Sequence, residues 1–157
     1  RGGILYHKTR HYDKAKESLL IAANDENNTT LVRETAWVTL CSMMEEISAY
    51  NDASVYYRQL VEMSPKVENY KLYGAFSYRR LQYNDAIYAY NEALNIATDK
   101  KDMFEINLAL GKCYFRMNEL DNAEESYKNA LSYNGGDSQA KEGLKQVASK
   151  KKLIYNR

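Results

Sequence analysis

Residues 110–131 read LGKCYFRMNELDNAEESYKNAL, and the order of small and aromatic residues in this stretch returns three more times along the chain. Each copy contains an aromatic residue, a short polar turn, an alanine and, four residues after the alanine, a second aromatic residue or a leucine. The alanines of the copies are spaced by 38, 33 and 37 residues, at Ala15, Ala53, Ala86 and Ala123. A period in this range is typical of a solenoid of stacked helical units.

The most complete copy joins a tryptophan, a leucine, an alanine, a tyrosine and a proline, at Trp37, Leu40, Ala53, Tyr57 and Pro65. This pattern resembles the tetratricopeptide repeat family, and with the other copies the resemblance covers nearly the whole chain. It implies an all-α, right-handed α-solenoid of antiparallel helix hairpins, with about four repeats and a C-terminal capping helix. Small residues let paired helices approach closely, and each hairpin leaves an apolar face that its neighbour must cover.

The register of the copies predicts where the helices lie. We predict pairs at residues 3–9 with 12–24, 31–46 with 50–63, 67–81 with 83–97 and 103–117 with 120–133. The corresponding repeats span about 1–29, 34–66, 67–100 and 104–137. Glycines at 135 and 136 end the array, and 138–157 is predicted as a capping helix, to about residue 152, and a tail. Because the chain starts at Arg1 without a methionine, we expect it to be a fragment of a larger protein.

The composition argues against several functional classes. With 22 basic and 21 acidic residues, the net charge of +1 lacks the basic excess on which nucleic-acid affinity depends. No apolar run approaches the roughly 18 residues of a membrane span, so none is predicted in this fragment. Cys41 and Cys113 are far apart in the sequence and have no CxxC pairing, so we interpret them as small core residues.

No set of residues in the sequence supports catalysis. His7 and His11 stand four residues apart, but a turn is predicted at residues 9–11 and no third metal ligand is evident. The adjacent acid pairs, such as Glu45 with Glu46, diverge by about 100° around a helix and do not form an acid–base pair. We therefore predict no enzymatic activity, no cofactor and no metal.

The family resemblance places a binding site on the first helix of each hairpin, where a concave groove takes a partner peptide or helix. In this register His7 and Lys8 lie at the start of the groove. An aromatic residue followed by an arginine occurs in two successive repeats, as Tyr78-Arg79 and Phe115-Arg116. Aromatic and arginine side chains are typical of binding hot spots. The predicted partner-binding residues are Glu45, Glu46, Lys71, Tyr78, Arg79, Lys112, Phe115 and Arg116.

Three functions are compatible with the sequence. The favoured one is a protein–protein interaction scaffold. The alternative is the periplasmic tetratricopeptide region of a bacterial polysaccharide-export or outer-membrane assembly protein, in which a glycan could be the ligand. An RNA-binding helical repeat is third, because acidic residues near the groove disfavour it. The lysine and asparagine pattern that clamps chaperone tails is missing, and both a cytoplasmic and a periplasmic location remain open.

Overall fold

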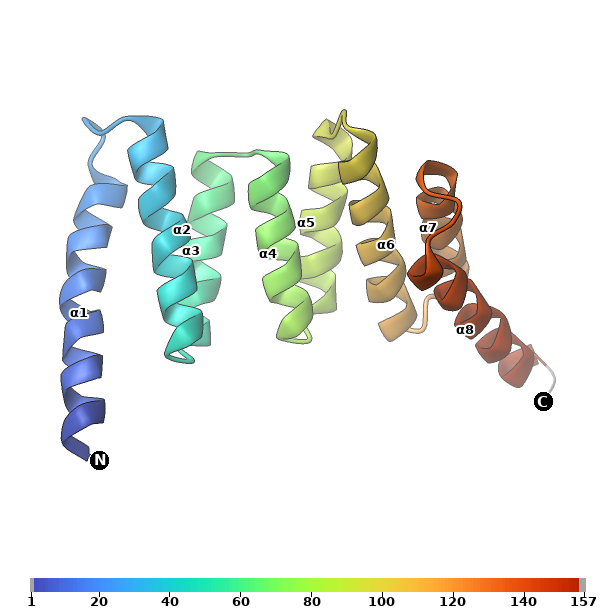
Figure 1. Cartoon of the computed structure of the whole chain (residues 1–157), viewed down its shortest axis with the longest axis horizontal. Coiled ribbons are helices and arrows are strands. Elements are labelled where there is room, and N and C mark those ends of the chain that lie inside the picture. The colour runs from blue at the N-terminus through green and yellow to red at the C-terminus, as the bar shows by residue number, and fades with distance from the viewer. Residues whose placement is uncertain (1, 156–157) are drawn as a thin grey trace. The chain divides into compact units, whose positions relative to one another are not determined.

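The structure is a computed structural model that describes the backbone of residues 2–155 and the side chains of residues 11–155. The described residues form eight α-helices and no β-strand (Figure 1). They divide into two compact units, Arg1–Pro65 and Lys66–Arg157. The helices are α1 (Gly2–Asn24), α2 (Thr30–Glu46) and α3 (Tyr50–Met63) in the first unit, and α4 (Val67–Arg79), α5 (Tyr83–Ile96), α6 (Lys100–Arg116), α7 (Leu120–Tyr133) and α8 (Ser138–Tyr155) in the second.

The prediction of an all-α array of antiparallel hairpins is confirmed, with differences at some helix ends. The predicted turn at residues 9–11 is wrong, because α1 continues without interruption from Gly2 to Asn24. No glycine or proline lies between residues 4 and 24 to break it. Helix α6 begins three residues earlier than predicted, because the side chain of Asp99 caps it by accepting a hydrogen bond from the backbone N–H of Lys101. Helix α8 extends past residue 152 to Tyr155.

The first unit is a hairpin of α2 and α3 with α1 packed against α2. Its core combines aliphatic and aromatic side chains, and the ring centroids of Trp37 and Tyr56 lie 5.8 Å apart. An ion pair of 3.1 Å between Lys16 and Asp52 links α1 to α3. The fully buried side chains of this core include Ala23, Leu40, Met44, Ala53 and Leu60.

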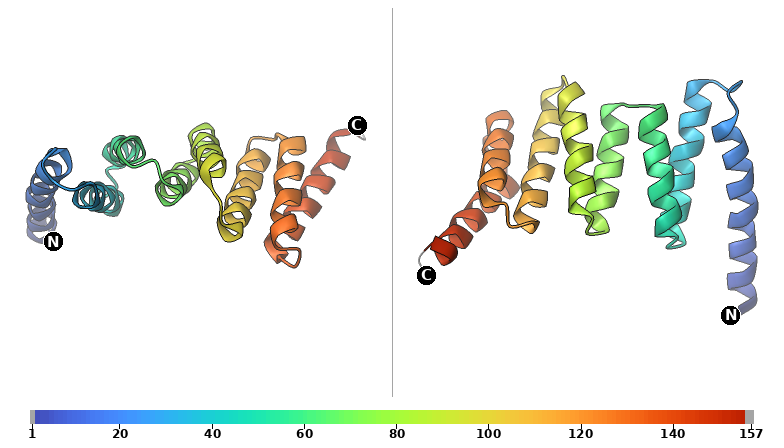
Figure 2. Two further views of the ribbon diagram at one scale, coloured as in Figure 1. Left: turned by 90° about the horizontal axis from the view of Figure 1, so that it is seen from above. Right: turned by 180° about the vertical axis from the view of Figure 1, so that it is seen from behind.

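The second unit contains the hairpins α4–α5 and α6–α7, with α8 packed mainly on α7 (Figure 2). Two glycines allow the close pairing of these helices. A Cβ atom on Gly74 would approach the ring of Tyr90 to 2.7 Å, and one on Gly111 would approach the ring of Tyr127 to 2.7 Å. Both distances are too short for a real Cβ contact, so each glycine accommodates a tyrosine ring from the second helix of its own hairpin.

The three turns inside the hairpins share one backbone conformation. A non-glycine residue adopts a positive φ in each, with values of 61° at Ser48, 60° at Leu81 and 62° at Asn118. In each turn the next residue donates its N–H to a carbonyl of the preceding helix, which is the Schellman end of a helix. These bonds are Ala49 to Met44 (2.7 Å), Gln82 to Ser77 (2.8 Å) and Glu119 to Tyr114 (2.9 Å).

None of the helices described is long and apolar enough to cross a membrane.

Candidate functional site

Six of the eight predicted binding residues lie in the second unit, on α4 and α6. Five of these six line one or both of two neighbouring hollows, and Lys71 lines neither. The hollows share Tyr78 and Lys112, so they adjoin. We refer to them as the α4–α6 hollow and the α6–α8 hollow.

The α4–α6 hollow has a volume of about 290 Å³. Ala75, Tyr78 and Arg79 of α4 form one side, and α6 supplies the opposite side with Glu105, Leu108, Ala109 and Lys112. The ring of Tyr90, which is itself buried, closes the hollow from α5. Burial raises the pKa of the Tyr90 hydroxyl, so this group stays neutral and can only exchange hydrogen bonds.

The α6–α8 hollow is larger, at about 830 Å³. Its α6 side contains the predicted residues Lys112, Phe115 and Arg116, and Tyr78 reaches it from α4. The α8 side was missed by the sequence analysis, which treated α8 only as a cap. The sequence contained a signal for this side: Ala140, Gly143 and Val147 recur at helical spacing, and they form the buried face of α8. The residues beside this face must lie at the edge of its contact with the neighbouring helices. Those that line the hollow are Ser138, Gln139, Glu142, Gly143 and Gln146.

Tyr78 links the two hollows through its ring and its hydroxyl. The hydroxyl oxygen accepts a hydrogen bond from Nε of Arg116, with a donor–acceptor distance of 3.4 Å. The ring meets the ring of Tyr83 edge-on, with centroids 5.6 Å apart. The bond to Tyr78 raises the pKa of the Arg116 guanidinium, a group that is always charged in proteins. The terminal nitrogens of Arg116 make no hydrogen bond with a described residue and retain donors for a ligand.

Contacts from α8 hold the other two α6 side chains. The ammonium of Lys112 donates to the side-chain oxygen of Gln139 at 2.8 Å, which leaves the charge of Lys112 without a described counter-ion. The ammonium of Lys150 lies 4.9 Å from the ring centroid of Phe115, within the range of a cation–π interaction. Phe115 is half-buried against the core of α7 and α8, so its ring is also part of the packing.

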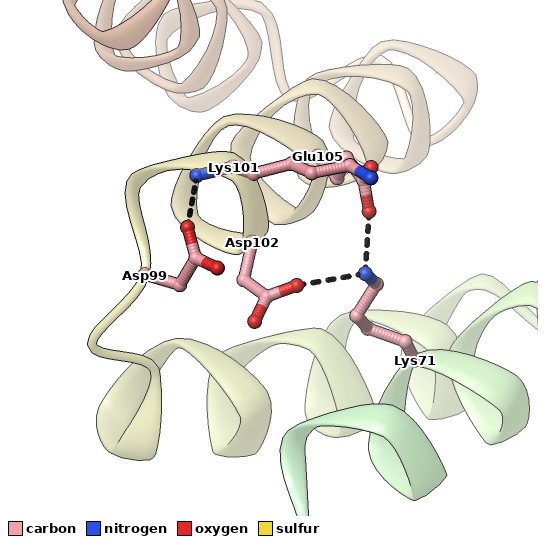
Figure 3. A network of polar contacts seen from close by, with 5 residues as sticks. All are labelled: Lys71, Asp99, Lys101, Asp102 and Glu105. Carbon is pink, nitrogen blue, oxygen red and sulfur yellow. Dashed lines mark hydrogen bonds and ion pairs between the residues drawn. The ribbon is translucent and has the colours of Figure 1, made fainter.

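Lys71 makes a different kind of contact from the one predicted (Figure 3). Its ammonium forms ion pairs with Asp102, at 3.1 Å, and with Glu105, so it joins α4 to α6. Partial burial by itself would lower the pKa of Lys71, but the hydrogen bonds to Glu105 and Asp102 raise it overall. Its charge is thus compensated within the protein, and the sequence offered no sign of this because the partners lie 31 and 34 residues away.

The remaining predicted residues belong to the first unit. The carboxylate of Glu45 accepts a hydrogen bond from the hydroxyl of Tyr57. Glu46 is hydrogen-bonded with Tyr12 and raises the pKa of that phenol. The side chains of His7 and Lys8 lie outside the described residues.

The described side chains contain no group of three or more His, Cys, Asp or Glu residues that could hold a metal ion. Both cysteines are buried. Burial raises the pKa of Cys113 to about 12 and raises that of Cys41 as well, so neither thiol is an activated nucleophile.

Comparison with known proteins identifies a tetratricopeptide repeat at residues 104–137, which comprise most of α6, all of α7 and the turn before α8. No curated protein matches the chain. Among solved structures, the N-terminal domain of stress-induced protein-1 from C. elegans is similar with a TM-score of 0.68 and 16% identity, over 78% of this chain and 99% of that one. The Sgt2 tetratricopeptide domain from Aspergillus fumigatus gives 0.65 and 20% identity, over 79% and 82%.

A MamA protein is similar over 96% of this chain and 79% of its own, with a TM-score of 0.68 and 21% identity. At such identities these likenesses concern the fold alone. The matched repeat, the paired helices and the similar structures agree with one another: residues 104–137 are a tetratricopeptide repeat, and the chain has the fold of tetratricopeptide-repeat structures.

Proposed function

We propose that the chain is a protein-interaction module that holds a peptide or helical segment of a partner protein in the α4–α6 and α6–α8 hollows. The observation that carries the proposal is their continuity: Tyr78 and Lys112 line both hollows. One segment can therefore contact α4, α6 and α8 in sequence. The volumes of about 290 and 830 Å³ are adequate for several side chains of such a segment.

The chemistry of the rim suits a polar segment with carboxylates. Arg116 is exposed and bound to Tyr78 only through Nε at 3.4 Å, so its terminal nitrogens can take a carboxylate in a bidentate arrangement. Lys112 contacts a neutral amide, which a carboxylate can replace with a gain in Coulomb energy. The same rim contains Glu105 and Glu142, which favour a partner whose charge is not uniform.

The fold supports this proposal over an enzyme, because tetratricopeptide folds typically serve as non-catalytic scaffolds. The contribution of Glu45 and Glu46 to partner binding stays a prediction, and the proposed site consists of second-unit residues alone.

The export or assembly alternative, with a glycan as ligand, has weaker support from the site. Sugar binding to aromatic residues needs an open ring face. Tyr127 is 4% exposed and its ring lies against Gly111 and Gly143, while Tyr90 is 7% exposed and its ring lies against Gly74. Tyr78 has one edge-on contact with Tyr83. The tyrosine rings that line the two hollows are therefore largely used in packing.

The test is selection of binders from a displayed random-peptide library against the whole chain, followed by fluorescence anisotropy of the selected peptides. The double variant Lys112→Glu with Arg116→Glu removes two of the three cationic side chains that line the hollows, the third being Arg79. We expect it to weaken the selected peptides by at least about tenfold, because charge reversal adds repulsion to the lost contacts.

The matched control is Lys100→Glu with Lys101→Glu, which makes the same charge change on the first turn of α6, away from both hollows. It should bind the peptides like the wild type, and circular dichroism should show equal helix content in all three proteins. Failure to select any peptide, or equal binding by both double variants, would contradict the proposal. Binding of an oligosaccharide array in place of peptides, with loss in Lys112→Glu/Arg116→Glu, would favour the glycan alternative.

A further inference from the structure

A third hollow lies on the other side of Phe115, where α6 meets the second half of α8. Its volume is about 390 Å³, enough for one large apolar side chain and its neighbours. Glu142, Gln146 and Phe115 line this hollow and also the α6–α8 hollow, so the two adjoin. The other residues that line it are Lys145, Ser149, Lys150 and Leu153. We call it the Phe115–Leu153 hollow.

The hollow offers a fixed apolar surface. Phe115 packs against the buried cluster that includes Ala123, Tyr127 and Val147, and this packing holds its ring in place. Leu153 also lines the hollow, and 70% of its surface is exposed. The aliphatic stems of Lys145 and Lys150 extend this apolar surface toward solvent. An apolar side chain from a partner would bury Phe115 and Leu153 together.

The rim of the hollow carries positive charge that the protein itself does not neutralise. Lys145 and Lys150 have no carboxylate partner among the described residues, and Lys150 contacts only the Phe115 ring. The neighbouring Lys151 provides a contrast, since it is bound by Asp121 at 2.7 Å and by Glu124 at 2.9 Å. Glu142 is the one acidic side chain that lines the hollow. Over 138–155 the sequence has five lysines and this single glutamate.

We infer that the Phe115–Leu153 hollow docks an acidic segment of the partner protein, with one large apolar side chain against Phe115 and Leu153 and carboxylates at Lys145 and Lys150. This inference rests on the proposed function, because the segment reaches the hollow from the adjoining α6–α8 hollow. It specifies the partner's chemistry there: an apolar anchor flanked by Asp or Glu. Two charge-assisted contacts near solvent and one buried apolar group select such a segment over a neutral one.

A protein segment fits this surface better than a nucleic acid or a membrane. The hollow has room for one large side chain and its neighbours, whereas phosphate backbones require an extended basic track. Attraction to an anionic membrane takes a cluster of four to eight basic residues on one surface. Here Lys151 is already paired, and Asp121 and Glu119 lie beside Ile154 and Tyr155 at the end of α8.

The test compares two double variants of α8 with the peptides selected on the whole chain. Lys145→Gln with Lys150→Gln removes the charges that line the hollow. Lys141→Gln with Lys152→Gln removes the same charge from exposed positions of α8 that do not line it. We expect the selected peptides to be acidic with one large apolar residue, and the first variant to weaken them about fivefold while the second leaves their affinity unchanged. Replacing the apolar residue of the peptide by serine should weaken wild-type binding as well.

Other results would overturn the inference, and they would also show whether the proposed function fails with it. Equal weakening by both double variants would indicate unspecific charge attraction, and basic or neutral selected peptides would contradict the predicted chemistry. Peptides that lose affinity in Lys112→Glu/Arg116→Glu but bind Lys145→Gln/Lys150→Gln normally would uphold the proposed function and reject the third hollow. Binding of phosphatidylserine vesicles in competition with the peptides would assign the lysines to a membrane surface instead.

Discussion

Gly111 of α6 lies so close to the ring of Tyr127 in α7 that a Cβ atom at this glycine would stand 2.7 Å from two of the ring carbons. The ring cannot retreat, because Gly143 of α8 contacts it as well and only 4% of its surface is exposed. The pair therefore sets the spacing between α6 and α7 and the position of α8. Burial also raises the pKa of Tyr127 to about 12.

Gly111→Ala should destabilise the protein although alanine is the better helix former. The gain in helix propensity is about 1 kcal/mol, whereas overpacking a filled site costs about 1–3 kcal/mol, so we expect a small net loss. Urea unfolding would measure it. Gly135→Ala is the control, since a Cβ there has its nearest neighbour at an ordinary 3.5 Å. A Gly111→Ala protein as stable as the control would show that the α6–α7 contact can open without cost.

Leu81→Gly should stabilise the turn between α4 and α5. Leu81 has a φ of 60° and is 71% exposed, so it bears left-handed strain without burying its side chain. Relief of this strain is worth about 1 kcal/mol. Asn118→Gly changes the equivalent turn and should gain less, because asparagine tolerates this conformation. The melting temperatures of the two variants would give the comparison, and an equal or reversed order would contradict it.

Ser77→Ala should be neutral or stabilising by up to about 1 kcal/mol. The Ser77 hydroxyl is fully buried in α4 and has no hydrogen-bond partner in the described structure, so its removal avoids a desolvation cost. Ser64→Ala provides the opposite case. The Ser64 hydroxyl is also buried but donates to the carboxylate of Glu34 at 2.7 Å, and its loss should cost about 1–2 kcal/mol. Equal effects in chemical denaturation would show that Ser77 has a partner after all.

The ion pair that holds α8 to α7 should weaken at acid pH. Hydrogen bonds from Lys128 and Lys151 lower the pKa of Glu124 to about 2, below its ordinary value of 4.5. Because the pKa of Glu124 is lower in the folded than in the unfolded protein, its carboxylate contributes to the free energy of unfolding above pH 4.5. This contribution is lost as the pH falls through about 2. We therefore expect Lys151→Met to lower the melting temperature at neutral pH and the difference from wild type to shrink toward pH 2. Lys152 has no ion pair with a described residue, so Lys152→Met is the control. A gap that also closed with this control would exclude Glu124 as the cause.

The sequence by itself determined the helices, their pairing and the aromatic core, because these follow from local periodicity. An alanine and a tyrosine four residues apart, repeated as Ala86 with Tyr90 and Ala123 with Tyr127, lie on one helix face whatever surrounds them. The same repetition indicated Tyr78, Arg79, Phe115 and Arg116 as one surface. The error at residues 9–11 arose where the pattern of the other repeats was extended to a segment that has no residue to break a helix.

Only the tertiary structure decided which of these side chains remain available to a ligand. Lys71 and Lys112 occupy comparable helices, yet Lys71 is neutralised by Asp102 and Glu105 while Lys112 meets the neutral amide of Gln139. Their partners come from the next hairpin or from α8, and whether such groups meet depends on how one helix rotates against another. Side-chain periodicity specifies the face of a helix but not this rotation, which is set by close contacts such as that of Gly111 with Tyr127.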